Sequence, residues 1–167
     1  MVRNFSSPTA AIEKKAEAIL EDARGQQPPQ CLFLWVRDHF QYDIVPVRGA
    51  EDLVVHDRER AMSFDKSNLL AALLRTQDIS CRFRLMVCQF HNTYAGRHDR
   101  AIHAPIEAKI QGKWMTLDPA FGQDTSAFRS PTAFGEEPWE SVSWETRRDT
   151  LPRWLIGGYN HVFRRVH

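Results

Sequence analysis

Residues 63–82 read SFDKSNLLAALLRTQDISCR, and this stretch is the most informative part of the sequence for the fold. Leucine and alanine fill its middle and leave almost no polar face, a pattern that is typical of a helix buried on all sides. We therefore expect a central helix from Phe64 to Thr76 that begins at Ser63.

Beyond this helix the period changes from helical to alternating. Apolar side chains occupy every second position over residues 81–87 and again over residues 102–110, which predicts two half-buried strands. Residues 91–100 between them read as a polar connection. The dipeptide Gln111-Gly112 is a tight-turn signal that leads into a third strand, Lys113 to Leu117, so we expect an antiparallel meander.

Helices are also expected ahead of the central one. Apolar residues recur at helical spacing over residues 8–24, with Ser7 as the candidate cap, and residues 32–40 predict a second, shorter helix. Residues 43–60 show no period, which indicates a loop with one short turn of helix near Asp57.

The order of these elements sets the expected fold class. Helices come first and strands later, which is typical of an α+β domain. The segment 122–167 is rich in tryptophan but lacks a sustained period, so we expect it to be irregular. A chain of 167 residues has the size of one ordinary domain. We therefore expect a single domain over residues 1–167 with its core at about residues 32–121.

Composition excludes several classes of function. Lys and Arg number 22 against 21 for Asp and Glu, and the net charge of +1 provides no field that would attract nucleic acid. No apolar run is long enough to span a bilayer, and the first residues lack the apolar run of a secretory signal. We therefore expect a cytoplasmic protein without a nucleic-acid or membrane partner, and we make no prediction of its oligomeric state.

Cysteine and histidine spacing offers no metal site. Cys31 and Cys81 stand apart from any metal-ligand or CxxC pattern and read as buried free thiols, as does Cys88. His91 and His98, taken with Cys88 and His103, match no standard ligand spacing. We expect neither a metal nor a cofactor.

The tight turn predicts a contact between two polar side chains. Counting back along both strands from Gln111-Gly112 places Asp118 across from Pro105, on the face that also carries His103. Diagonal neighbours of this kind lie about 7–8 Å apart at the backbone, within joint reach of an imidazole and a carboxylate. Asp118 would then fix the tautomer of His103 and stabilise its cation.

The start of the central helix suits a nucleophile. A helix N-terminus presents unpaired N–H groups and a partial positive charge, which lower the pKa of a thiol and help to hold an oxyanion. Ser63 stands at this place. Taken alone, such a serine is most simply a helix cap, so the case for a nucleophile depends on its joint placement with His103 and Asp118.

These segments together resemble the transglutaminase-like family, whose fold is papain-like. Residues 63–82 are similar to that family's cysteine, helix and strand entry, and residues 103–121, HAPIEAKIQGKWMTLDPAF, are similar to its histidine strand and closing Asp-Pro. Residues 34–43, LWVRDHFQYD, resemble the segment before the nucleophile. The resemblance covers about residues 32–121, and it implies that Ser63, His103 and Asp118 occupy the places of a Cys-His-Asp triad.

Three positions depart from the family pattern. Ser63 replaces the cysteine, and a hydroxyl is a far weaker nucleophile near neutral pH. Pro105 replaces the usual aromatic residue, which implies a strand edge or a bulge, and Asp78 stands where glycine is usual. Ser63 has three readings: an introduced change that traps a competent enzyme, a natural serine that still performs acyl transfer, or the mark of a lapsed enzyme that only binds.

Three aromatic residues are candidates for binding the substrate or the oxyanion. Tyr42 lies where the family often has an aromatic near the nucleophile, although packing against the central helix is an equally simple role. Phe64 directly follows the nucleophile position. Trp114 lies on the face of His103 and Asp118, as either a groove wall or a cover for the sheet.

The resemblance implies an acyl-transfer enzyme that acts on an amide or thioester of a peptide, a protein or a small molecule. Peptidase, amidase and amine acyltransferase activities all belong to this class. A second hypothesis is a non-catalytic binding module for a peptide or protein partner. A third is a biosynthetic acyltransferase or cyclase.

Overall fold

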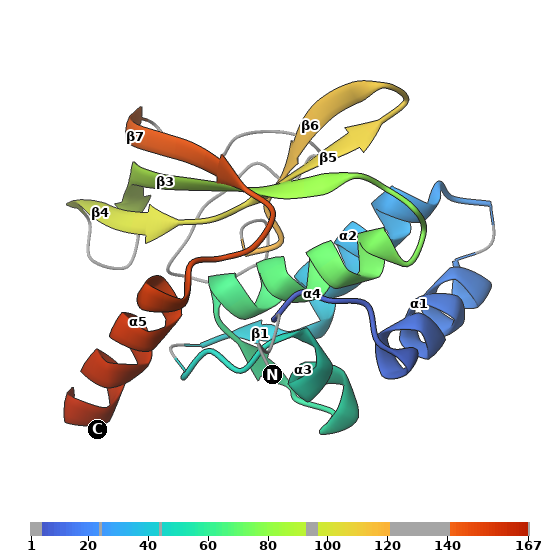
Figure 1. The fold of residues 1–167 in the computed structure, drawn as a ribbon, viewed down its shortest axis with the longest axis horizontal. Helices are drawn as coiled ribbons and strands as arrows, with labels where there is room; N and C mark the ends of the chain where they lie inside the picture. Colours follow the sequence, from blue (N-terminus) through green and yellow to red (C-terminus); the bar gives the residue numbers. More distant parts are fainter. Residues whose placement is uncertain (1–4, 24, 44, 93–96, 121–140, 167) are drawn as a thin grey trace.

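The computed structural model describes residues 5–23, 25–43, 45–92, 97–120 and 141–166. Within these ranges the helices are α1 (Ala10–Asp22), α2 (Pro28–His39), α3 (Ala50–Val55), α4 (Ser63–Arg75) and α5 (Arg153–Val166). The strands are β1 (Gln41–Tyr42), β2 (Arg60–Ala61), β3 (Cys81–Asn92), β4 (Arg97–His103), β5 (Ile106–Ile110), β6 (Lys113–Leu117) and β7 (Ser141–Arg148). Helices α1 to α4 form one layer beneath an antiparallel sheet (Figure 1), which confirms the α+β class.

Helix α4 occupies the centre of the molecule, as predicted. It contacts α1, α2 and α3 as well as β3 and β5, so it is the helix of this layer that joins the other helices to the sheet (Figure 1). Every residue from Ser63 to Leu74 is buried. The four leucines of the helix are 0% exposed, and burying each one contributes about 2 kcal/mol.

Strand β3 organises the sheet by pairing with three other strands. β4 and β5 pair with successive parts of it, and β7 also pairs with it. Met86 of β3 pairs with His103 of β4, and Phe83 of β3 pairs with Ile106 of β5. Between these two pairs, the Arg84 N–H donates a hydrogen bond of 2.9 Å to the Pro105 carbonyl. The single strand predicted over residues 102–110 is therefore divided into β4 and β5, because Pro105 has no N–H for the ladder.

The predicted turn and its register are confirmed. Gln111 and Gly112 have φ of 51° and 80°, the left-handed values that a two-residue type I′ turn requires. Pairing runs from Ile110 with Lys113 to Ile106 with Leu117. The ladder therefore ends immediately before Asp118.

The N-terminal helix has a different cap from the one predicted. Thr9, not Ser7, is the N-cap: its backbone is extended and its Oγ1 accepts the N–H of Ile12 at 3.5 Å. A capping side chain accepts the N–H two or three residues ahead. Thr9 stands three residues before Ile12, whereas Ser7 stands five residues before it and is too far away. Helix α1 lies within the predicted range 8–24.

Three segments that were expected to be irregular contain regular structure. Residues 43–60 include α3 and the start of β2, and of the polar connection residues 91–92 extend β3 and residues 97–100 belong to β4. Within residues 122–167, strand β7 and helix α5 are present, while residues 121–140 lie outside the described residues. Strand pairing with a distant partner orders polar stretches that show no local period. No helix in the described ranges is long and apolar enough to cross a membrane.

Candidate active site

The structure brings His103 and Asp118 into direct contact. His103 ends β4 and Asp118 follows β6, and both side chains are buried. His103 Nε2 lies 2.5 Å from Asp118 Oδ2, and Asp118 Oδ1 accepts the N–H of Ala120 at 3.1 Å. Both carboxylate oxygens are therefore held, which fixes the orientation of the imidazole.

This bond determines what the imidazole can do. A carboxylate accepts hydrogen bonds, so a neutral ring beside Asp118 carries its proton on Nε2 and a lone pair on Nδ1. Nδ1 lies on the other side of the ring from Nε2 and is directed away from Asp118. When Nδ1 takes a proton, the carboxylate stabilises the resulting cation. The pair can thus accept and release a proton at Nδ1.

Ser63 is the first residue of α4 and is 8% exposed. The cap position belongs to Met62, whose backbone is extended and whose side chain has no oxygen to accept a bond. The reading of Ser63 as a simple helix cap is therefore wrong. The first backbone bond of the helix runs from the Lys66 N–H to the Met62 carbonyl at 3.0 Å, so the N–H groups of the three preceding residues have no acceptor within the helix.

Lys66 was overlooked in the sequence, although it follows Ser63 by one helical turn. Its side chain is 0% exposed, and its Nζ donates to the Arg37 carbonyl at 3.0 Å. Burial lowers the pKa of Lys66 to about 7, and the carboxylates of Asp38 and Asp118 oppose this shift. The signal in the sequence was a lysine inside a helix with almost no polar face.

Asp65 joins the first turn of α4 to the segment before α3. Its Oδ1 accepts the N–H groups of Arg48 at 2.8 Å and Gly49 at 3.2 Å. Burial raises the pKa of Asp65 to about 6, although these backbone bonds act against the shift. Asp65 thus positions the start of α4 at a cost in electrostatic free energy.

Tyr42 and Phe64 both lie near the start of α4. Tyr42 pairs with Ala61 in the two-stranded β1–β2 ladder, and Ala61 precedes Ser63 by two residues. The Phe64 side chain is 3% exposed and belongs to the hydrophobic core, while its N–H is one of those at the helix end. Backbone pairing therefore places Tyr42 opposite Ala61, two residues ahead of Ser63 in the chain.

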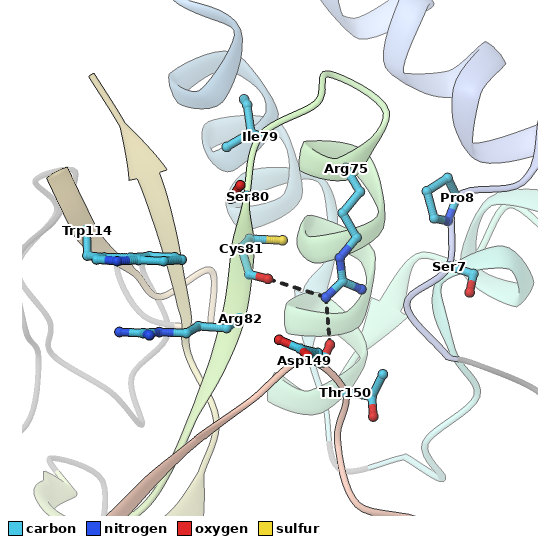
Figure 2. A pocket seen from close by; sticks show the side chains of 10 residues that line it. All are labelled: Ser7, Pro8, Arg75, Ile79, Ser80, Cys81, Arg82, Trp114, Asp149 and Thr150. Atoms are coloured by element: carbon cyan, nitrogen blue, oxygen red, sulfur yellow. Dashed lines mark hydrogen bonds between the residues drawn. The ribbon is translucent and has the colours of Figure 1, made fainter. Parts of the chain in front are cut away.

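Trp114 lies elsewhere on the sheet. It precedes Asp118 by four residues along β6, about 13 Å at the rise of a strand. The indole is 44% exposed, and the Arg82 guanidinium lies over it at 4.1 Å from the ring centroid (Figure 2). The structure does not bring Trp114 to the His103–Asp118 pair.

Trp114 instead lines a cleft of about 560 Å³ that also contains Arg75 and Asp149 (Figure 2). The Arg75 guanidinium donates to the Ser6 carbonyl at 2.8 Å, the Ser6 hydroxyl at 2.9 Å and the Asp149 carbonyl at 2.6 Å. These bonds join the N-terminal segment, α4 and the segment after β7. Arg75 therefore stabilises the fold at this cleft.

The three native thiols are poor nucleophiles. Cys31, Cys81 and Cys88 are free and buried, as predicted. Burial raises the pKa of Cys31 and of Cys81, and burial with the nearby Asp118 charge raises that of Cys88 to about 11. The side chains of His91 and His98, considered above as metal ligands, lie outside the described residues.

Comparisons with known proteins identify the family and the fold. A family model described as the transglutaminase-like superfamily matches residues 12–119. A candidate cysteine protease from Cytophaga hutchinsonii has a similar structure, with a TM-score of 0.52 and 18% identity over 70% of this chain. The chain covers only 40% of that protein, and the likeness shows the fold alone. LapG from Legionella pneumophila aligns over 96% of this chain and 99% of its own, with a TM-score of 0.44 and 10% identity.

No curated protein matches the sequence. The family match covers more than half of the chain, and it spans Ser63, His103 and Asp118. The expectation of a papain-like, transglutaminase-like core is therefore confirmed.

Proposed function

The chain belongs to the transglutaminase-like superfamily, and on that premise we propose that it is an acyl-transfer enzyme acting on an amide or thioester through Ser63, His103 and Asp118. The observation that carries this proposal is the buried His103–Asp118 pair, with 2.5 Å between Nε2 and Oδ2. Burying an imidazole and a carboxylate costs free energy that an apolar pair would not. Paired titratable groups of this kind concentrate at functional sites.

In the proposed reaction the side chain of residue 63 attacks the carbonyl carbon of the substrate. N–H groups at the start of α4 hold the oxyanion, and the helix dipole favours the negative charge there. His103 transfers protons at Nδ1, and Asp118 keeps its ring in place. Water or an amine then resolves the acyl-enzyme, giving hydrolysis or amine transfer.

The proposed substrates are peptides, proteins or small molecules that carry an amide or thioester. One feature favours a second function: Ser63 stands where the family has its cysteine, as expected for a lapsed enzyme that binds a peptide or protein partner. The experiment below separates the two.

The test restores the thiol by Ser63→Cys and follows alkylation by iodoacetamide at pH 6 with mass spectrometry. A thiol of ordinary pKa is about 0.3% thiolate at this pH, whereas a thiol paired with an imidazolium is largely ionised. We therefore expect Cys at position 63 to react about 100-fold faster in the presence of His103 than in a His103→Ala background. The native thiols, which are buried, should stay unlabelled.

Ser80→Cys provides the matched control, because Ser80 is exposed and lies in the segment between α4 and β3. Its alkylation should be slow and independent of His103. If Ser63→Cys behaves in the same way as this control, the catalytic proposal is refuted and the binding module is favoured.

A further inference from the structure

A buried lysine lies one helical turn beyond the proposed nucleophile. Lys66 is the third residue after Ser63 on α4, so the two side chains emerge on one face of the helix. Helical side chains lean toward the N-terminus of their helix, which extends the stem of Lys66 over the turn that begins at Ser63. Lys66 is 0% exposed, so no solvent reaches its amine.

The charged groups that face Lys66 come from two directions. Arg37 and Asp38 belong to the last turn of α2, and the Arg37 carbonyl accepts a hydrogen bond from Nζ at 3.0 Å. Asp118, the partner of His103, also acts electrostatically on Lys66. Lys66 is therefore bonded to the C-terminal end of α2, and the charge of Asp118 favours its protonated form.

The protonation state of Lys66 decides what it can do. Burial lowers its pKa to about 7, so the neutral amine is well populated near neutral pH. A neutral amine keeps N–H groups, one of which can bond the Arg37 carbonyl, and it has a lone pair that can accept the proton of a hydroxyl. An ammonium group has no such acceptor.

A structural explanation exists as well. Lysine often bonds the last carbonyl groups of a helix, and Lys66 does this for α2. A cap of this kind commonly comes from an exposed side chain, because burial removes the solvation of the charge. The position of Lys66, inside the buried helix that carries Ser63, is unexplained by capping alone.

We propose that Lys66 is the general base that takes the hydroxyl proton of Ser63, an inference that rests on the proposed acyl-transfer function. Ser63 Oγ bonds to the carbonyl carbon as its proton passes to Lys66 Nζ. His103, in its imidazolium form beside Asp118, gives a proton to the leaving group as the C–N or C–S bond breaks. Water then attacks and passes a proton to His103, and Ser63 Oγ departs with the proton from Lys66. The protons balance without a further reactant.

With Lys66 as the base and His103 as the acid, a serine can react at the position where the family has its cysteine. A thiol beside an imidazole and a helix N-terminus is readily ionised, whereas a hydroxyl keeps its proton until a base removes it during attack. Lys66 should therefore matter for Ser63 and not for a cysteine at the same position.

The test compares the two nucleophiles in Lys66 variants. A fluorophosphonate labels wild-type Ser63 by forming an O–P bond and releasing fluoride, and the hydroxyl proton passes to Lys66. Lys66→Met should slow this labelling by about 100-fold or more, the range of general-base catalysis. Lys66→Arg should not rescue it, because a guanidinium stays protonated. Lys109→Met, which removes an exposed lysine on β5, should leave the rate unchanged.

The same substitutions are then made in the Ser63→Cys background and followed with iodoacetamide. Labelling should stay within roughly threefold of the rate with Lys66 present, since the thiol does not need this base. A structural role for Lys66 would slow the serine and the cysteine alike, and that outcome overturns the inference. Wild-type labelling rates in Lys66→Arg overturn it as well.

The two proposals fail in distinguishable ways. If the alkylation rate of the Ser63→Cys variant is the same with and without His103, the acyl-transfer site is refuted, independently of the results for Lys66. Cysteine labelling that depends on His103, together with a wild-type serine that does not react, leaves the site standing and refutes the role of Lys66. If Lys66→Met does not fold, judged by circular dichroism, the decision rests on Lys66→Arg, which keeps a donor for the Arg37 carbonyl.

Discussion

Replacing Asp118 by asparagine should disable the site with almost no change in shape. Asp118 accepts the Ala120 N–H at Oδ1 and faces His103 Nε2 at Oδ2. Asparagine has one oxygen and one amino group, so it can accept at only one of these places. With its oxygen on Ala120, its amino group faces Nε2 and moves the ring proton to Nδ1. His103 then holds the wrong tautomer to act as a base.

The magnitude follows from the ionisation of the thiol in the Ser63→Cys background. With the carboxylate present, the imidazolium is stabilised and the thiol beside it is largely ionised at pH 6. Without the carboxylate, the thiol pKa returns toward 8.5 and the thiolate falls to about 0.3%. We expect the iodoacetamide rate at pH 6 to fall by about 100-fold, measured as a mass-spectrometric time course.

A matched acid-to-amide control is Asp78→Asn. Asp78 is exposed and has a φ of 54°, which asparagine also adopts readily. This substitution should leave the alkylation rate unchanged. A fall of less than roughly threefold for Asp118→Asn would show that the carboxylate does not set the tautomer or the charge of His103.

Three further predictions concern stability. Because the folded pKa of Asp65 is raised to about 6 from an ordinary 3.8, wild-type stability should fall as the pH rises from about 4 to 6, by up to about 3 kcal/mol. Asp65→Asn should flatten this part of the profile of melting temperature against pH, and an unchanged slope would contradict the assignment. Arg75→Lys should lower the free energy of unfolding, measured with urea, by about 2 kcal/mol, because one ammonium cannot reach the oxygens of both Ser6 and Asp149. An unchanged urea midpoint would show that these hydrogen bonds contribute nothing to stability. Gly112→Ala should lower the free energy of unfolding by about 1 kcal/mol, because φ at this position is 80°, which alanine adopts with strain. No atom lies within 4 Å of an added Cβ, so a loss several times larger would indicate a clash that the structure does not contain.

The parts of the site that lie close together in the sequence were predictable. Gln111-Gly112 specified its own turn, the turn set the register, and the register predicted the approach of His103 to Asp118 that the structure contains. The position of α4 followed from composition alone, because a helix with almost no polar face has to be buried on all sides.

What escaped prediction depends on contacts between distant parts of the chain. β7 pairs with β3, so Phe83 lies opposite Arg148, and no local pattern records such a partner. Helix α5 holds two adjacent glycines, which weaken its propensity, while Leu155 and Ile156 pack into the core. Lys66 was missed for a different reason, since the composition of α4 implied that its side chain is buried, but only the structure shows which carbonyl its amine contacts.

Departures from the family pattern have local explanations where the structure describes them. Asp78 replaces a usual glycine at a left-handed position, and aspartate tolerates that conformation better than most residues. Pro105 separates β4 from β5 but still accepts the Arg84 N–H, so the register is kept on both sides. Neither change disturbs the approach of His103 to Asp118.

A crystal structure of the wild-type chain after reaction with a fluorophosphonate would test most directly whether Ser63, His103 and Asp118 act together. We expect the adduct on Ser63, with its Oγ within hydrogen-bond reach of His103 Nδ1, about 3 Å or one water away, and with His103 Nε2 still on Asp118. A chain that crystallises unmodified, with the Ser63 hydroxyl directed away from the imidazole, would contradict it.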